Sequence, residues 1–185
     1  MKRTFYLVVL SILLLLVTGC STTKPSTVVD GYMKELQNNI TTILNEDVEI
    51  AEGDESLYNA MVNAMKEFEY EIVEETVNED SAVVRVRIKT YALGLSFANA
   101  ITDYLSQALS LAFSGASEET IKNLMFQTWT DKISEEVDKG KNYTETITIE
   151  LEKIDNKWTI KNDKDEKIFN ALTGNLLNII EKMGE

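Results

Sequence analysis

The sequence predicts an α+β domain in which a bent antiparallel sheet of about four strands, arranged as two hairpins, packs against helices. Three observations predict this class. Two separate regions alternate apolar and polar residues, each region has a turn signal near its centre, and helix-spaced apolar stripes lie before, between and after them. The expected element order is ααββααββα within one domain, residues 27–185.

Two helices are expected before the first strand. Apolar residues recur at helical spacing from Thr27 to Leu44 and from Glu55 to Phe68, and Gly53-Asp54 is the expected break between them. The two stripes are Val29, Tyr32, Leu36, Ile40 and Ile43, and then Leu57, Met61, Met65 and Phe68.

The first hairpin is expected to follow directly, with Asn78-Glu79-Asp80 as its turn. Its second strand has an apolar set and a mostly basic set, which should face opposite sides of the sheet. These sets are Ala82, Val84, Val86 and Ile88, and Val83, Arg85, Arg87 and Lys89. The basic side chains are expected to pair with acidic residues of the neighbouring strand such as Glu71 and Glu75.

A helical pair, residues 93–139, is expected between the two hairpins. Ser114-Gly115-Ala116 should end its first helix, and Ser117 should cap the second, with acidic residues near the positive end of the helix dipole. Lys139-Gly140 is a usual helix end. The stripe of the first helix is Leu93, Phe97, Ile101, Leu105, Leu109 and Ala112.

The second hairpin is expected from Tyr143 onward, with Asp155-Asn156 as its turn and Trp158 on the return strand. One last helix should then complete the domain, with Asp163 or Asp165 as its cap. Its stripe is Ile168, Leu172, Leu176, Ile180 and Met183.

The first nineteen residues predict an export signal. A basic start is followed by an apolar run of 13 positions, Phe5 to Val17, broken only by Ser11. This run is shorter than the roughly 18–20 residues of a membrane-spanning helix. It leads into Val17-Thr18-Gly19-Cys20, which resembles the lipobox of bacterial lipoproteins. The resemblance implies diacylglyceryl transfer to the sulfur of Cys20 and cleavage between Gly19 and Cys20.

At least two acyl chains on Cys20 would anchor the protein stably, because one chain gives only marginal binding. The expected location is the cell membrane, with the protein lipid-anchored on its extracytoplasmic face. Residues 20–26 are expected to form the lipidated end and a flexible tether, which reaches at most about 20 Å. The alternative is an ordinary signal peptide with an incidental cysteine.

Charge and residue usage exclude several functions. The chain has 31 acidic and 18 basic residues, a net charge of −13. Removal of Lys2 and Arg3 with the signal leaves 31 acidic and 16 basic residues, so the expected mature chain carries a net charge of about −15. A surface with this charge repels nucleic-acid phosphates. With no histidine and one cysteine, the usual Ser-His-Asp and Cys-His nucleophile arrangements cannot form. We therefore expect a protein that is not an enzyme, with no metal site, no catalytic residues and no cofactor.

Three segments of the mature chain look like a group of uncharacterised lipoproteins from Gram-positive bacteria. The segments are residues 80–86, 151–160 and 170–176. Those lipoproteins carry domains of unknown function, often assigned a fold similar to nuclear transport factor 2 and cystatin. The resemblance implies helices packed in the concave face of the bent sheet, with the helical pair as an insertion.

Two tryptophans are candidates for a ligand or partner surface. Trp158 is either an aromatic platform in a ligand cavity or a core anchor under the last helix. Trp129, together with Tyr104 and Phe126, either lines a groove or faces a partner, or else is buried against the sheet. The partner would be a protein or a small molecule.

Glu145 is the third candidate. It shares the side-chain phase of Ile147 and Ile149, and a carboxylate that enters an apolar cone can act as a base. Isomerases with the cone fold use an acidic base of this kind, so the fold resemblance implies the same role for Glu145. The place of Glu145 near the start of its strand implies contact with solvent instead. The functional classes are therefore a surface lipoprotein acting as a non-catalytic binding or interaction module, an enzyme with an acidic base, and a purely structural surface protein.

Overall fold

The computed structural model describes residues 23–47, 55–161 and 166–184. The expected signal segment 1–19, the expected lipid attachment site Cys20 and the candidate caps Asp163 and Asp165 lie outside these residues. Within the described ranges, no helix has the length and apolar character that crossing a bilayer requires.

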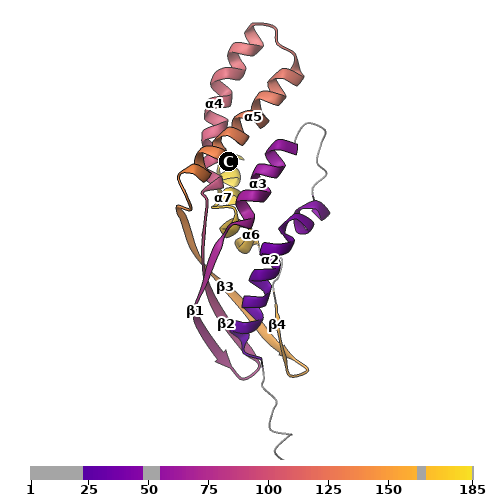
Figure 1. Cartoon of the computed structure of the whole chain (residues 1–185), viewed down its shortest axis with the longest axis vertical. Coiled ribbons are helices and arrows are strands. Elements are labelled where there is room, and N and C mark those ends of the chain that lie inside the picture. The colour runs from indigo at the N-terminus through magenta and orange to yellow at the C-terminus, as the bar shows by residue number, and fades with distance from the viewer. Residues whose placement is uncertain (1–22, 48–54, 162–165, 185) are drawn as a thin grey trace, which may run out of the picture.

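The predicted α+β class is confirmed, and so are the two hairpins (Figure 1). The strands form one antiparallel sheet in the order β1-β2-β3-β4, in which β2 and β3 join the hairpins. The elements are α2 (Pro25–Asp47), α3 (Glu55–Lys66), β1 (Glu69–Asn78), β2 (Ser81–Thr90), α4 (Leu93–Phe113), α5 (Glu118–Asp138), β3 (Tyr143–Ile154), β4 (Lys157–Ile160), α6 (Glu166–Leu172) and α7 (Leu176–Gly184). The closer likeness to nuclear transport factor 2 stays a prediction.

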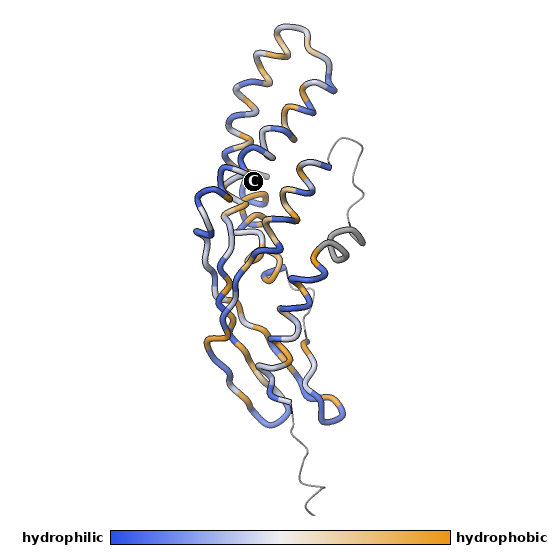
Figure 2. The backbone as a smooth tube through the Cα atoms, viewed as in Figure 1, coloured by the Kyte–Doolittle hydropathy of each residue, from blue (hydrophilic) through white to orange (hydrophobic). Residues whose placement is uncertain are grey.

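The main core lies between the sheet and two helices. Helix α2 contacts β1, β2 and β4, and α6 contacts β2 and β3. The apolar set predicted for β2 is buried, and its polar set is exposed, as the alternation requires. Opposite these strands, α2 contributes Val29, Met33, Leu36 and Ile40. Figure 2 shows the hydrophobic residues of the strands and of α2 in the same part of the molecule.

Helix α2 begins earlier than expected. Pro25 lies in its first turn, where the missing backbone N–H of proline carries no penalty. The backbone N–H of Ser26 donates to Glu75 Oε2 on β1 at 2.7 Å, so a side chain from the sheet satisfies the helix end. Pro25 and Ser26 therefore belong to the folded domain and not to the tether.

The outer face of the first hairpin carries two ion pairs. Arg87 pairs with Glu71 at 2.6 Å, as predicted. Arg85 pairs with Glu74 at 2.9 Å, so the predicted role of Glu75 is wrong. The reason is a β-bulge between Ile72 and Glu74, which shifts the register by one residue and turns Glu75 toward α2.

The single last helix predicted from the stripe is wrong, because the chain breaks it into α6 and α7. Gly174 and Asn175 adopt left-handed backbone angles, with φ of 59° and 72°. The carbonyl of Gly174 accepts a hydrogen bond from the backbone N–H of Gly94 at 3.2 Å. This break joins the C-terminal helices to the beginning of α4.

Candidate functional site in the helical arm

Helices α4 and α5 form an antiparallel hairpin, the helical arm, which extends beyond the sheet along the long axis of the molecule (Figure 1). At its base α5 packs on α3, and α4 packs on α7. Ser117 caps α5 as predicted, since its hydroxyl accepts from the backbone N–H of Thr120 at 3.1 Å. The fold thus holds the arm at its base and leaves its far end outside the main core.

Trp129 belongs to the interior of the arm. Its ring lies 4.7 Å from the ring of Phe97, centroid to centroid, and its Nε1–H donates to Ser96 Oγ at 3.4 Å. Phe126 is half-buried beside Lys122, whose Nζ lies 5.1 Å from the ring centroid, and Tyr104 is also half-buried. Trp129 therefore packs between α4 and α5, and it is partly buried against the margin of the main core.

The outer part of α4 carries an apolar ridge, formed by Leu105, Leu109 and Phe113. Their side chains are 54%, 62% and 90% exposed. Residues four apart lie above one another on a helix, so the three share one side of α4. Leu95, five turns before Phe113, lies on the same side and is also exposed. Figure 2 shows hydrophobic positions along the arm as far as its tip.

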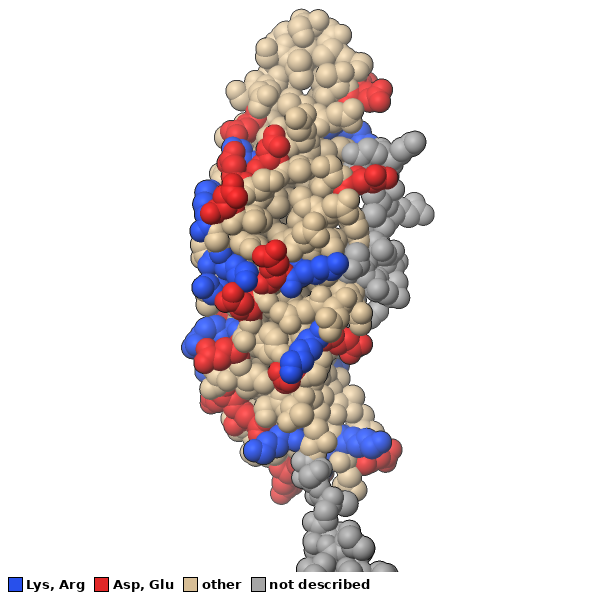
Figure 3. All heavy atoms as spheres, in the orientation of Figure 1, with Lys and Arg blue, Asp and Glu red and all other residues tan. Residues whose placement is uncertain are grey.

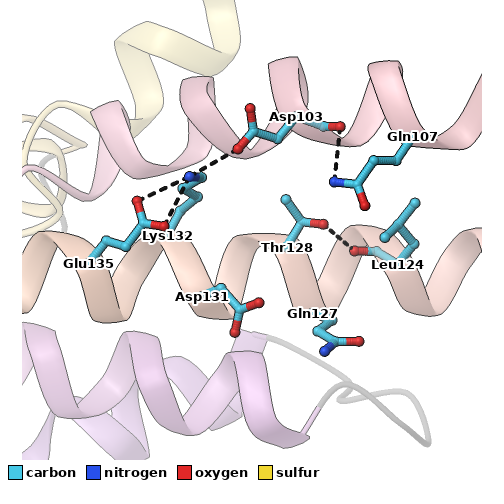
Figure 4. A pocket seen from close by; sticks show the side chains of 8 residues that line it. All are labelled: Asp103, Gln107, Leu124, Gln127, Thr128, Asp131, Lys132 and Glu135. Carbon is cyan, nitrogen blue, oxygen red and sulfur yellow. Dashed lines mark hydrogen bonds and ion pairs between the residues drawn. The ribbon is translucent and has the colours of Figure 1, made fainter.

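Helix α4 has one charged residue, Asp103, in its 21 positions. Asp103 Oδ2 lies 2.9 Å from Lys132 Nζ on α5, and Lys132 also contacts Glu135. The hydrogen bond with Asp103 is the largest of the effects that raise the pKa of Lys132, so the contact favours the charged ammonium group. Because Asp103 points toward α5 (Figure 4), the ridge on the other side of α4 carries no charge. The face of the arm that Figure 3 presents has few charged side chains near the tip.

A shallow hollow of about 280 Å³ lies between the two helices of the arm (Figure 4). Its lining residues are Asp103, Gln107, Leu124, Gln127, Thr128, Asp131, Lys132 and Glu135. Thr128 Oγ1 donates to the carbonyl of Leu124, and Gln107 Nε2 donates to the carbonyl of Asp103. Several of its polar groups are therefore used within the arm. In the described part of the chain, no cluster of three or more acidic or cysteine ligands could hold a metal ion.

Trp158 lies on β4, half-buried against the core. Lys153 Nζ is 5.5 Å from its ring centroid. Helix α2 packs on β4, so Trp158 lies against the core beside α2, whereas α6 packs mainly on β2 and β3. The side chain packs at the edge of the sheet and does not line the hollow described in the arm.

Glu145 lies near the start of β3 and is half-buried. Its Oε2 accepts a hydrogen bond from the hydroxyl of Tyr143 at 2.6 Å. Burial, and then this contact, raise the pKa of Tyr143 well above its usual value. The structure does not bring Trp129, Trp158 and Glu145 together: they lie on α5, on β4 and at the opposite end of β3.

Two further tyrosines also donate to carboxylates across elements. Tyr70 contacts Asp30 Oδ1 at 2.7 Å, and Tyr91 contacts Glu67 Oε2 at 2.5 Å. Burial, followed by Asp30, raises the pKa of Tyr70 to about 12; Glu67, followed by burial, raises the pKa of Tyr91 to about 12. The neutral tyrosine is thus favoured in the folded state.

We expect the protein to lose stability between pH 10 and about 12. A tyrosine pKa that is raised from 10 in the folded state contributes stability fully below pH 10, and that contribution disappears as the pH rises through the folded value. Tyrosinate absorbance and circular dichroism, followed together through this range, test the expectation. Tyr91→Phe should weaken the pH dependence, whereas ionisation of all tyrosines near pH 10 without unfolding would contradict it.

The comparison with solved structures finds a likeness to a candidate lipoprotein (ycdA) from Bacillus subtilis subsp. subtilis str. 168. The two share 14% sequence identity and a TM-score of 0.44, over 80% of this chain and 45% of that one. The chain therefore spans less than half the length of that protein. No family model and no curated protein matches the sequence.

Proposed function

We propose that this protein is a lipoprotein, held by lipid on Cys20 at the extracytoplasmic face of the cell membrane, and that its helical arm is a non-catalytic protein-binding module. The observation that carries the binding role is the apolar ridge on α4, because apolar side chains gathered on an exposed face indicate an interaction surface. The lipobox-like sequence before Cys20 supports the anchor.

The beginning of the folded domain lies at one end of the molecule, which we call the anchor pole: the start of α2 at Pro25 and the hairpin turns at 79–80 and 155–156 (Figure 1). The contact of Ser26 with Glu75 holds α2 there, and Lys153 N–H donates to the carbonyl of Asp80 at 2.8 Å between the hairpins. Pro25 follows Cys20 by five residues, a span of at most about 18 Å. A lipid on Cys20 would therefore keep the anchor pole near the membrane.

The apolar ridge would then face away from the membrane. Strand β2 leads from the anchor pole to the base of the arm over ten residues, and α4 continues to the tip over 21 residues. With about 3.3 Å per strand residue and 1.5 Å per helix residue, the two together reach about 60 Å. A surface at that distance meets other proteins and not the lipid in which its own anchor is embedded.

A non-catalytic role fits the side chains in the described residues. Glu145, the candidate base, already accepts a hydrogen bond from Tyr143, and several polar groups of the hollow bond within their own arm. The acidic charge of the chain argues against nucleic acid as a partner. We further propose that the sheet with its covering helices follows the nuclear transport factor 2-like plan of the Gram-positive lipoproteins, with the arm as an insertion.

The anchor is tested by comparing the full-length chain with Cys20→Ala in the producing bacterium. We expect the wild-type protein in the membrane fraction, with a lipid-sized mass on an N-terminal Cys20, and the Cys20→Ala variant as an uncleaved or released form. Ser21→Ala is the matched control and should behave as wild type. Intact and peptide mass spectrometry decide the question, and an unmodified Cys20 in the wild type would overturn the proposal.

A further inference from the structure

We infer that the apolar ridge docks against the ridge of a second copy of this chain, anchored in the same membrane, about a twofold axis parallel to the membrane normal. The inference rests on the lipid anchor of the proposed function and names the partner of the same surface. The participating side chains are Leu105, Leu109 and Phe113 of each copy.

Shared anchoring supplies the geometry. Two copies that are held at their anchor poles can stand side by side with their arms pointing away from the membrane, which places their ridges at about the same height. The arm extends along the long axis of the molecule (Figure 1), and the ridge follows α4 toward its tip. A twofold axis along that direction brings each ridge residue near its own copy, which is the self-complementary contact of a symmetric dimer.

Charge favours the ridge as the contact between copies. The anchored chain, without Lys2 and Arg3, would carry 31 acidic and 16 basic residues, and this net charge of about −15 opposes association of two identical chains over most of their surface. The ridge side of α4 has no charge, because Asp103 faces α5 and pairs with Lys132. Thr102 and Ser106 lie on this same side, are exposed and are small, so a second helix can approach α4 closely. The beginning of α5, in contrast, carries Glu118 and Glu119.

The contact should be weak in solution and effective on the membrane. Three large side chains from each copy bury less area than the roughly 1,200–2,000 Å² of a stable interface. Anchoring in one plane raises the effective concentration of the ridges, which compensates for part of the missing area. We therefore expect dimers of the lipidated protein in membranes and monomers of the Cys20→Ala protein at low concentration.

Disulfide cross-linking in the bacterial membrane tests the inference. Cys20 is the single cysteine and its sulfur would carry the lipid, so Ser106→Cys adds one free thiol beside the ridge and leaves all three ridge residues intact. Under mild oxidation this variant should give a disulfide-linked dimer. Asn123→Cys is the matched control, since it lies exposed on α5 at a similar height of the same arm, and it should give little dimer.

Each outcome has one meaning. A dimer with Ser106→Cys that is lost when Phe113→Glu is added supports the inference. Equal dimer from Ser106→Cys and Asn123→Cys would show random collision and overturn it, as would no dimer from lipidated Ser106→Cys protein. Mass spectrometry of the same membranes reports the lipid on Cys20. Failure of the anchor is therefore distinguished from failure of the contact between ridges.

Discussion

Replacing Gly174 with alanine is expected to lower the free energy of unfolding by roughly 3–5 kcal/mol, which is more than most single substitutions cost. Two effects add up here, strain of the backbone and a steric clash. The φ of Gly174 is +59°, which costs a residue with a side chain about 1 kcal/mol or more. A Cβ at this position would also lie 2.2 Å from the carbonyl oxygen of Tyr91 and 2.8 Å from Cα of Ala92. Both are backbone atoms, so α6, α7 and the base of the arm would have to move apart.

Gly115→Ala separates the two mechanisms. Gly115 has φ of +79° and no heavy atom within 4 Å of the position that a Cβ would take. This variant should therefore show only the backbone strain, about 1 kcal/mol. Urea denaturation of both variants measures the difference. Equal losses would mean that the junction between Gly174 and Tyr91 tolerates a methyl group, contrary to the packing described.

Phe68→Ala is expected to lower the free energy of unfolding by about 3–5 kcal/mol. The ring is 1% exposed and lies where α3 leads into β1, with the ring of Tyr70 at 6.1 Å. The carbonyl of Phe68 accepts from Gln37 Nε2 of α2 at 2.7 Å, so the cavity would open where α2, α3 and the sheet meet. Thermal and urea unfolding measure the loss.

Phe113→Ala is the matched control because it removes the same side chain from a site that is 90% exposed. Its expected effect on stability lies within about 0.5 kcal/mol. A loss as large as that of Phe68→Ala, at protein concentrations too low for association, would mean that Phe113 is needed to fold the arm. The ridge would then be part of the core and not an interaction surface.

Most of the fold could be predicted from the sequence because local patterns determine it. The alternation in β2 and the turn residues of both hairpins give strands with one buried face, and Ser117 marks the start of α5. The apolar pattern does not reveal the break at Gly174, because Leu172 and Leu176 keep helical spacing across it. Its cause is a contact with Tyr91, about eighty residues away along the chain, although Gly174-Asn175 is itself a turn-like pair.

The candidate site was predicted less well, for a similar reason. The helical stripe of α4 contains Leu93, Leu105 and Leu109, and spacing alone makes them equivalent. The structure buries Leu93 at the base and exposes the other two, because the arm extends past the elements that would cover them. The scarcity of charge in α4 was the available signal, since an uncovered helix normally carries a charged face. The acidic partner of Arg85 is determined by the bulge in β1, and the spacing of residues in the sequence does not reveal a bulge.

The bulge in β1 also bears on aggregation. Strands β1 and β4 are the edges of the sheet, and an edge with unpaired backbone groups can recruit a strand from another molecule. Strand β1 is irregular between Ile72 and Glu74 and is rich in glutamate, and β4 has only four residues. Such edges are poor templates for continued strand pairing. If copies gather on one membrane as proposed, these edges would let them come close together without growing into sheets, and the proposed association would be left to the helical arm.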